Sequence, residues 1–134
     1  MLNPRIIPCL LIDNGSLVKT LNFKNPKYVG DPINAVRIFN EKQVDELIIL
    51  DISANKKNNQ INFNLIKKLA YECNMPLCYG GGIKNVEDAE KIIKLGVEKI
   101  AISSAAINNL NLINSISNKL GAQSVVVVID VKLT

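Results

Sequence analysis

Residues 46–83 read ELIILDISANKKNNQINFNLIKKLAYECNMPLCYGGGI, in which two short apolar runs are separated by a longer amphipathic segment. ELIILDIS (46–53) and PLCYGGGI (76–83) have the length and the continuous apolar character of buried parallel strands. Between them, residues 62–73 carry apolar side chains at helical spacing, which predicts a helix with one buried face. The stretch is therefore predicted to be a strand–helix–strand unit.

The same alternation continues in both directions along the chain. Further strands are expected over residues 5–12, 99–106 and 124–130, and further helices over residues 31–43, 85–95 and 110–120. Units that repeat every ~25 residues favour parallel strands joined by helices.

A complete (β/α)8 barrel takes about 250 residues, whereas this chain has 134. The fold is thus predicted to be α/β, as the first half of a TIM (β/α)8 barrel with about four βα units plus a fifth strand. Residues 1–134 are expected to be one domain and a fragment, because a final strand without a covering helix exposes apolar surface. On pattern alone, a five-stranded doubly wound sheet is the alternative.

The composition excludes several classes of protein. An apolar content of 48% argues against disorder, and no apolar run reaches the length of a membrane helix. The chain has no histidine, which excludes Ser-His-Asp catalysis and His-ligated zinc. Its three cysteines lack metal-ligand spacing and fit a reducing, cytoplasmic compartment. The net charge of +4 is spread along the chain, so nucleic acid is not an expected partner.

Polar residues follow the strands at the edge where a barrel carries its active site. Gly80, Gly81 and Gly82 end one strand, and Ser103 and Ser104 lie toward the end of the next. Glycines there allow backbone N–H groups to approach an anion, and the serines can add hydroxyl donors, which indicates a phosphate site. The alternative is a tight turn with solvated serines. The glycines lack the GxGxxG spacing of a dinucleotide site, and the sequence contains no metal-ligand cluster, so no cofactor and no metal are expected.

Carboxylates also stand at these strand ends. Asp51 follows LIIL and Asp130 follows VVVVI, while Asp13 follows the first strand. Without histidine, acids grouped at one barrel mouth are what general acid/base catalysis would need. The alternative is that each acid only caps its strand.

Three charged residues, Arg5, Glu46 and Lys99, stand at the opposite ends of the strands. They could meet at the floor of a barrel as a buried ion-pair cluster, which is costly and needs a reason. The alternative is that each is a solvated strand cap.

Taken together, several motifs resemble the cyclase subunit of imidazole glycerol phosphate synthase. They are RIIPCLL, the downstream GxLVKT (15–20), GDPINAVRIFNE, DELIILDIS, PLCYGGGI and the closing VVVVID. The resemblance is collinear over essentially all of the chain and covers the N-terminal half of that family's barrel.

The resemblance implies a reaction of histidine biosynthesis. The family closes an imidazole ring on a phosphoribulosyl-formimino aminoimidazole-carboxamide ribonucleotide, with ammonia from a glutaminase (glutamine amidotransferase) partner on the barrel floor. It releases imidazole glycerol phosphate and aminoimidazole-carboxamide ribonucleotide. Two aspartates act as acid and base, and phosphates bind on both halves of the barrel.

Carried over to this chain, the resemblance assigns roles to single residues. Asp130 matches the second catalytic aspartate, and Lys19 matches the lysine of the mobile loop after the first strand. The phosphate and ammonia-gate residues are matched by two groups: Gly81, Gly82, Ser103 and Ser104 for the phosphate, and Arg5, Glu46 and Lys99 for the gate. The family usually has Asn-Thr where this chain has Ser-Ser, and its fourth gate residue would lie beyond Thr134.

One departure concerns the first catalytic aspartate, which aligns with Leu11. Leucine cannot transfer protons. Asp13 has the same strand parity and lies about 6.6 Å further out, so it is the candidate substitute acid, in a loop that can fold back.

Two other functions remain open. PCLL, GxLVKT and YVGDPINAVRIFNE also resemble cyclase-like paralogues that deliver ammonia for amidation of surface-glycan sugars, where an acid at position 11 would be dispensable. A third possibility is a non-catalytic half barrel that binds phosphate and pairs with a second copy.

Overall fold

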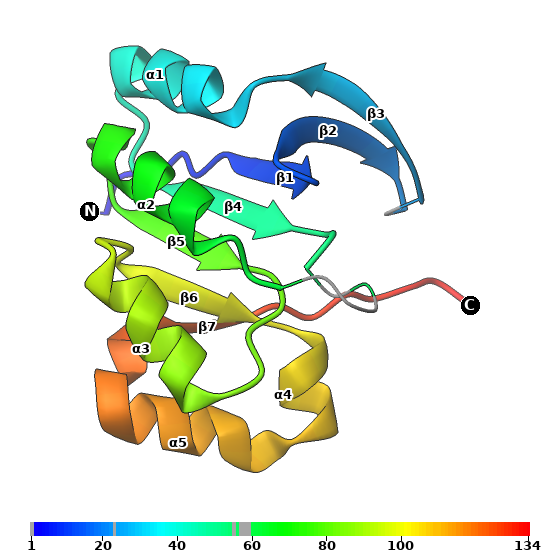
Figure 1. Cartoon of the computed structure of the whole chain (residues 1–134), viewed down its shortest axis with the longest axis vertical. Coiled ribbons are helices and arrows are strands. Elements are labelled where there is room, and N and C mark those ends of the chain that lie inside the picture. The colour runs from blue at the N-terminus through cyan, green and yellow to red at the C-terminus, as the bar shows by residue number, and fades with distance from the viewer. Residues whose placement is uncertain (1, 23, 55, 57–59) are drawn as a thin grey trace.

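Five parallel strands form the centre of the sheet in the computed structural model, which describes residues 2–22, 24–54, 56 and 60–134 (Figure 1). They are β1 (Cys9–Asp13), β4 (Leu47–Asp51), β5 (Leu77–Gly80), β6 (Lys99–Ile102) and β7 (Val125–Val127). Neighbours in the sheet follow chain order, β1-β4-β5-β6-β7, with no reversal. A doubly wound sheet requires such a reversal, so that alternative is wrong.

The longer connecting helices lie on one side of the sheet. The helices are α1 (Pro32–Lys42), α2 (Phe63–Glu72), α3 (Val86–Lys94), the short α4 (Ser104–Asn108) and α5 (Leu110–Leu120), followed by the 3-10 turn η1 (Ala122–Ser124). Right-handed crossovers that always step in the same direction place their helices on one face. In Figure 1, α2 and α3 lie in front of strands whose arrowheads point the same way. The chain is therefore α/β, as the first half of a (β/α)8 barrel.

Side-chain caps explain where three helices begin. Carboxylate or amide oxygens of Asp31, Asn62 and Asn85 accept hydrogen bonds of 2.9, 3.0 and 2.8 Å from the backbone N–H three residues on. Each cap satisfies a donor that the first helical turn leaves unpaired. The helix starts predicted near residues 31 and 85 are confirmed.

The sheet has two faces with different surroundings. Ile12, Ile49, Tyr79 and Ile100 point toward the helices and are at most 1% exposed. On the other face the strand register aligns one row across the sheet: Leu11, Leu50, Gly80, Ala101 and Val126. This second face is the one that lines the interior of a barrel.

An antiparallel hairpin extends the sheet beyond β1, and the sequence patterns did not predict it. It consists of β2 (Ser16–Leu21) and β3 (Lys24–Gly30). Asn14 and Gly15 form the turn before β2 with φ values of 49° and 80°, and Asn-Gly is the preferred pair for such a tight turn. Lys19 therefore lies in a strand, opposite Lys27, and not in the loop that was expected.

All five parallel strands differ in their bounds from prediction: β4 and β5 lie within the expected ranges 46–53 and 76–83 but are shorter. The first strand starts at Cys9 instead of residue 5 and extends to Asp13. The strand expected over residues 99–106 ends at Ile102, because Ser104 begins α4. The last strand covers only Val125–Val127 of the expected 124–130. None of the helices in the part of the chain that is described is long and apolar enough to cross a membrane.

Candidate functional site

The C-terminal ends of the parallel strands border a cavity of about 350 Å³. Most of the predicted site residues line it: Asp13, Asp51, Gly80, Gly81, Gly82, Ser103, Ser104 and Asp130. Asp130 follows β7 and is exposed, whereas Asp13 ends β1 and is 9% exposed. The cavity thus joins residues from five separate strand ends.

The glycine segment after β5 has a backbone that only glycine adopts easily. Gly81 and Gly82 have φ values of 128° and 71°. A Cβ on Gly81 would collide with the backbone oxygen of Asp51, and one on Gly82 would lie 2.9 Å from Cβ of Ala54. The turn therefore needs glycine for its own geometry. It also leaves bare backbone on the cavity wall, which an anion could approach.

A buried hydrogen-bond network lies at the end of β4. The backbone N–H and the hydroxyl of Ser53 donate to Oδ1 of Asp51 over 2.9 and 2.6 Å, and the Tyr79 hydroxyl lies 3.4 Å from Oδ2. The backbone N–H of Asn14 donates to the Ser53 hydroxyl oxygen over 3.1 Å. This network links the ends of β1, β4 and β5. For Asp51 it supports the strand-end cap over a proton-transfer role, since both carboxylate oxygens already have donors.

Burial affects the titration of the phenol in this network. Tyr79 is 1% exposed. Its pKa is raised above the ordinary tyrosine value, first by loss of solvation and then by the negative charge of Asp51. Tyr79 therefore serves as a neutral hydrogen-bond donor to Asp51.

Asp13 has a cationic neighbour, Lys56, that was not predicted from the sequence. Nζ of Lys56 lies 3.4 Å from both carboxylate oxygens of Asp13, and both residues line the cavity. Since Asp13 is the last residue of β1 and is paired to Ser16 in the hairpin, the expectation that it lies in a loop able to fold back is wrong. Leu11 pairs with Leu50 in the apolar row of the same sheet.

Lys19 is not among the residues that line the cavity in the described part of the chain. It is exposed on β2. Its assigned role remains a prediction from the resemblance.

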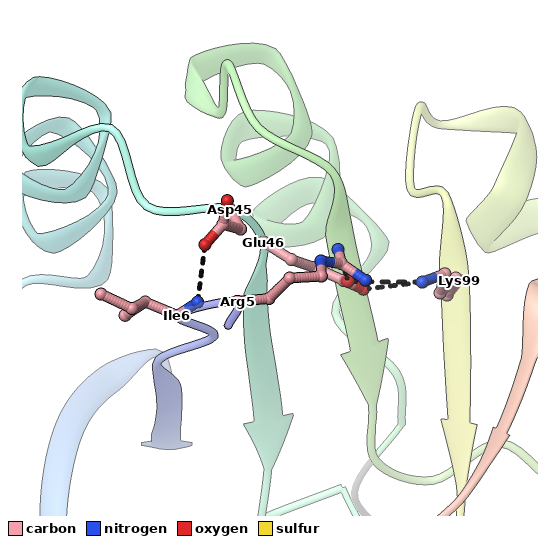
Figure 2. A network of polar contacts seen from close by, with 5 residues as sticks. All are labelled: Arg5, Ile6, Asp45, Glu46 and Lys99. Atoms are coloured by element: carbon pink, nitrogen blue, oxygen red, sulfur yellow. Dashed lines mark hydrogen bonds and ion pairs between the residues drawn. The ribbon is translucent and has the colours of Figure 1, made fainter. Parts of the chain in front are cut away.

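At the opposite ends of the strands, Arg5, Glu46 and Lys99 form one ion-pair cluster (Figure 2). Nη2 of Arg5 lies 2.9 Å from Oε2 of Glu46, and Nζ of Lys99 lies 3.2 and 3.3 Å from the two oxygens. The Glu46 side chain is 5% exposed, against 54% for Arg5 and 27% for Lys99. The acid is therefore the buried centre of the cluster, with two cations around it.

A second contact holds the N-terminal segment against this cluster (Figure 2). Oδ2 of Asp45 accepts from the backbone N–H of Ile6 over 2.6 Å, and the backbone N–H of Asp45 donates to the Ile6 oxygen over 3.0 Å. These two bonds fix the backbone beside Arg5. The sequence offered no signal for them, because Ile6 and Asp45 are far apart in the chain.

The residues described do not include a cluster of three or more His, Cys, Asp or Glu side chains that could hold a metal ion. Cys78 lies next to the ion-pair cluster and is 1% exposed. Loss of solvation, together with the negative charge of Glu46, raises the pKa of its thiol to about 12. The thiol is thus protonated at neutral pH.

Comparison with known proteins gives consistent matches over nearly the whole chain. The family model described as "Histidine biosynthesis protein" matches residues 5–134. A Pseudomonas aeruginosa protein named "Putative imidazole glycerol phosphate synthase subunit hisF2" is 61% identical, over 97% of this chain and 52% of its own length. A Leptospira interrogans protein named "Putative imidazole glycerol phosphate synthase subunit HisF" is 59% identical, over 100% and 53%.

A more distant relative bears the same subunit name without that qualifier. The Lactococcus lactis subsp. cremoris protein "Imidazole glycerol phosphate synthase subunit HisF" is 45% identical, over 98% of this chain and 51% of its own length. The chain therefore spans about half the length of the curated relatives it matches.

Proposed function

The chain belongs to the family of histidine biosynthesis proteins, and from this membership we propose that it forms the N-terminal half of a cyclase barrel of the imidazole glycerol phosphate synthase type. In this proposal the barrel uses ammonia from a glutaminase subunit. It converts the phosphoribulosyl-formimino ribonucleotide into imidazole glycerol phosphate and aminoimidazole-carboxamide ribonucleotide.

In this proposal the cavity is the substrate-binding site. Backbone N–H groups of Gly81 and Gly82 and the hydroxyls of Ser103 and Ser104 bind one substrate phosphate. Asp130 exchanges protons with the substrate, and Asp13 is the second carboxyl group that lines the same space. Support comes from their presence around one cavity although they follow different strands.

In this proposal the ion-pair cluster lies where ammonia enters the barrel. Arg5, Glu46 and Lys99 lie at the strand starts, where a glutaminase docks in the proposal. From this side toward the cavity, the interior face carries the row that runs from Leu11 to Val126, which has no charged or polar side chain and whose Leu50, Gly80 and Ala101 line the cavity itself. An apolar passage carries neutral ammonia and opposes ammonium, because an unpaired ion is costly to desolvate.

The observation that carries the proposal is that β4 and β6 each connect the two ends. Glu46 precedes β4 and Asp51 ends it, while Lys99 begins β6 and Ser103 follows it. The same parallel strands thus carry charged residues at their starts and polar residues at their carboxyl ends. A reaction that receives ammonia at one end of the barrel and binds its substrate at the other requires this arrangement.

The test is ammonia-dependent turnover of the ribonucleotide by a barrel-length protein. In this protein the chain is joined to the C-terminal half of the Pseudomonas aeruginosa relative. Asp130→Asn is expected to lower turnover by at least about 100-fold. Lys67→Met, at an exposed lysine of α2 outside the cavity, is the control and should leave turnover unchanged. Full turnover by Asp130→Asn would contradict the assignment of Asp130.

Leu11 favours a second candidate, the paralogue that delivers ammonia for amidation of a surface-glycan sugar. It is an apolar residue of β1 beside Leu50, where the resemblance places an acid. If the chain is such a paralogue, the barrel-length protein has no cyclase turnover, and Leu11→Asp creates it only if the remaining site is intact. Cyclase turnover with Leu11 in place would instead favour the cyclase and a role for Asp13.

A further inference from the structure

The charges around the cavity are unbalanced for an anionic ligand. Asp13, Asp51 and Asp130 bring three carboxyl groups to the lining. Among the lining residues that the structure describes, Lys56 is the one cationic side chain. The glycine backbone and the serine hydroxyls offer dipoles but no net charge. A phosphate that enters beside carboxylates therefore needs Lys56 as its counter-charge.

The contact of Lys56 with Asp13 is loose enough to be exchanged. Both distances are 3.4 Å, longer than the roughly 2.7–2.9 Å typical of a strong charge-assisted hydrogen bond. The Lys56 side chain is 58% exposed while that of Asp13 is 9% exposed. Such a half-solvated pair has little net stability, so a better acceptor can displace Asp13.

The backbone of Lys56 is nevertheless held in place. Its N–H donates to the Ser53 carbonyl oxygen over 3.1 Å. Ser53 in turn bonds to Asp51 through both its backbone N–H and its hydroxyl. The four-carbon side chain can therefore turn beside the cavity while the backbone N–H of Lys56 stays bonded to Ser53. Lysine suits this task, because its ammonium group binds phosphate as a point charge without a fixed angle.

We propose that Lys56 is the cationic ligand of a phosphate monoester in this cavity, and that it leaves Asp13 when the phosphate binds. The inference rests on the proposed phosphate site and adds its positive charge. Exchange of the ammonium group from a carboxylate to a phosphate dianion couples two events. Phosphate binding removes the ion pair from Asp13, so Asp13 faces the substrate without its resting partner.

This coupling predicts whether each substitution weakens or strengthens phosphate binding. Lys56→Met removes the charge and weakens phosphate binding, whereas Lys56→Arg retains it. Asp13→Asn removes the resting partner of Lys56 and one neighbouring negative charge, so phosphate binding becomes tighter. If Asp13 instead holds Lys56 in its binding position, Asp13→Asn has the opposite effect.

The experiment is calorimetric titration of the full chain with ribose 5-phosphate, with ribose as the ligand that lacks the phosphate. The matched control variant is Lys67→Met, since Lys67 is an exposed lysine of α2 that lies outside the cavity. Expected results are binding of ribose 5-phosphate but not ribose, a Kd raised about 10-fold by Lys56→Met, and a Kd lowered about 3-fold by Asp13→Asn. Circular dichroism checks that each variant is folded.

Each contrary result overturns a distinct statement. If the unsubstituted chain binds neither ligand, the phosphate site of the proposed function is wrong, and the role of Lys56 with it. If the chain binds ribose 5-phosphate and Lys56→Met binds it equally well, only the role of Lys56 is wrong. If Lys56→Met weakens binding but Asp13→Asn weakens it too, Lys56 is a phosphate ligand that does not leave Asp13.

Discussion

The hydroxyl oxygen of Tyr79 lies 3.4 Å from Oδ2 of Asp51, between two neighbouring strands and away from solvent. Asp51 is 5% exposed and also receives two hydrogen bonds from Ser53. A buried carboxylate is costly unless donors surround it. The phenol is thus one of the groups that hold the ends of β4 and β5 together beneath the helices.

Removal of that phenol should destabilise the fold. Tyr79→Phe leaves the ring in the core but deprives Oδ2 of Asp51 of this donor. We expect the free energy of unfolding at pH 7 to fall by about 1–2 kcal/mol, measured by urea denaturation. Tyr71→Phe is the matched control, because Tyr71 is 87% exposed. Equal stabilities of the two variants would mean that the 3.4 Å contact contributes nothing.

Ionisation of the same phenol should lower the stability of the fold at alkaline pH. The folded pKa of Tyr79 is raised above the unfolded value of about 10, so the folded state holds the proton more tightly. Its contribution to stability is complete below about pH 10 and is lost as the pH rises through the folded pKa. Stability measured from about pH 8 upward should therefore fall less steeply in Tyr79→Phe than in the unsubstituted chain. Parallel curves would contradict this prediction.

Gly81 should tolerate no side chain. Gly81→Ala combines a φ of 128° with a collision between the new Cβ and the Asp51 backbone oxygen. We expect a loss of about 2–4 kcal/mol in unfolding free energy. Gly30→Ala is the control, because a Cβ at that residue would have no atom within 4 Å, and its stability should stay within about 0.5 kcal/mol. Thermal unfolding of both variants decides the matter.

Lys99 should contribute more to stability than a surface lysine with the same type of partner. Lys99→Met leaves the buried Glu46 with Arg5 as its remaining cation among the contacts described, at a cost of about 1–2 kcal/mol. Lys94→Met removes an exposed pair with Glu90 on one helix, worth about 0.3–0.5 kcal/mol. Urea denaturation at pH 7 compares the two. Similar losses would mean that burial of Glu46 does not strengthen its ion pairs.

Cys78 should resist alkylation in the folded chain. Its thiol is buried and has a pKa of about 12, so very little thiolate is present at about pH 8. Partial loss of solvation raises the pKa of the Cys9 thiol as well, but Cys9 is exposed to the reagent and should react with iodoacetamide faster. Peptide mass spectrometry after timed alkylation measures both sites at once, and urea should abolish the difference. Fast labelling of Cys78 without urea would show that its surroundings open.

The parallel half of the fold was predictable because its signals are local. Asp31 and Asn85 indicate helix starts by residue type alone, and the apolar runs at residues 46–53 and 76–83 contain β4 and β5. The hairpin was missed because β3 is polar and almost wholly exposed, so no apolar alternation marks it. The sequence feature that indicates the hairpin is the Asn14–Gly15 pair, because Asn-Gly favours a tight hairpin turn whatever the hydropathy of the strands around it.

The candidate site was likewise predictable from the sequence only in part. Residues at strand ends were found from the sequence, because the ends of parallel strands share one edge of the sheet. The residues that contact them were not found: Lys56 and Asp13 are 43 positions apart in the sequence, and Tyr79 and Asp51 are 28 positions apart. Such pairs depend on which loop folds over which strand, and a single sequence contains no distance information of that kind.

The length of β4 has a consequence for how this protein can change over time. From Glu46 to Asp51 the backbone extends for about 16 Å, with the ion-pair cluster at one end and the Ser53–Tyr79 network at the other. Substitutions at sites this far apart, with no shared partner, have nearly additive effects on stability. Selection can therefore change the residues at the carboxyl ends of the strands while the ion-pair cluster at the strand starts keeps its charges, so the two ends can evolve independently.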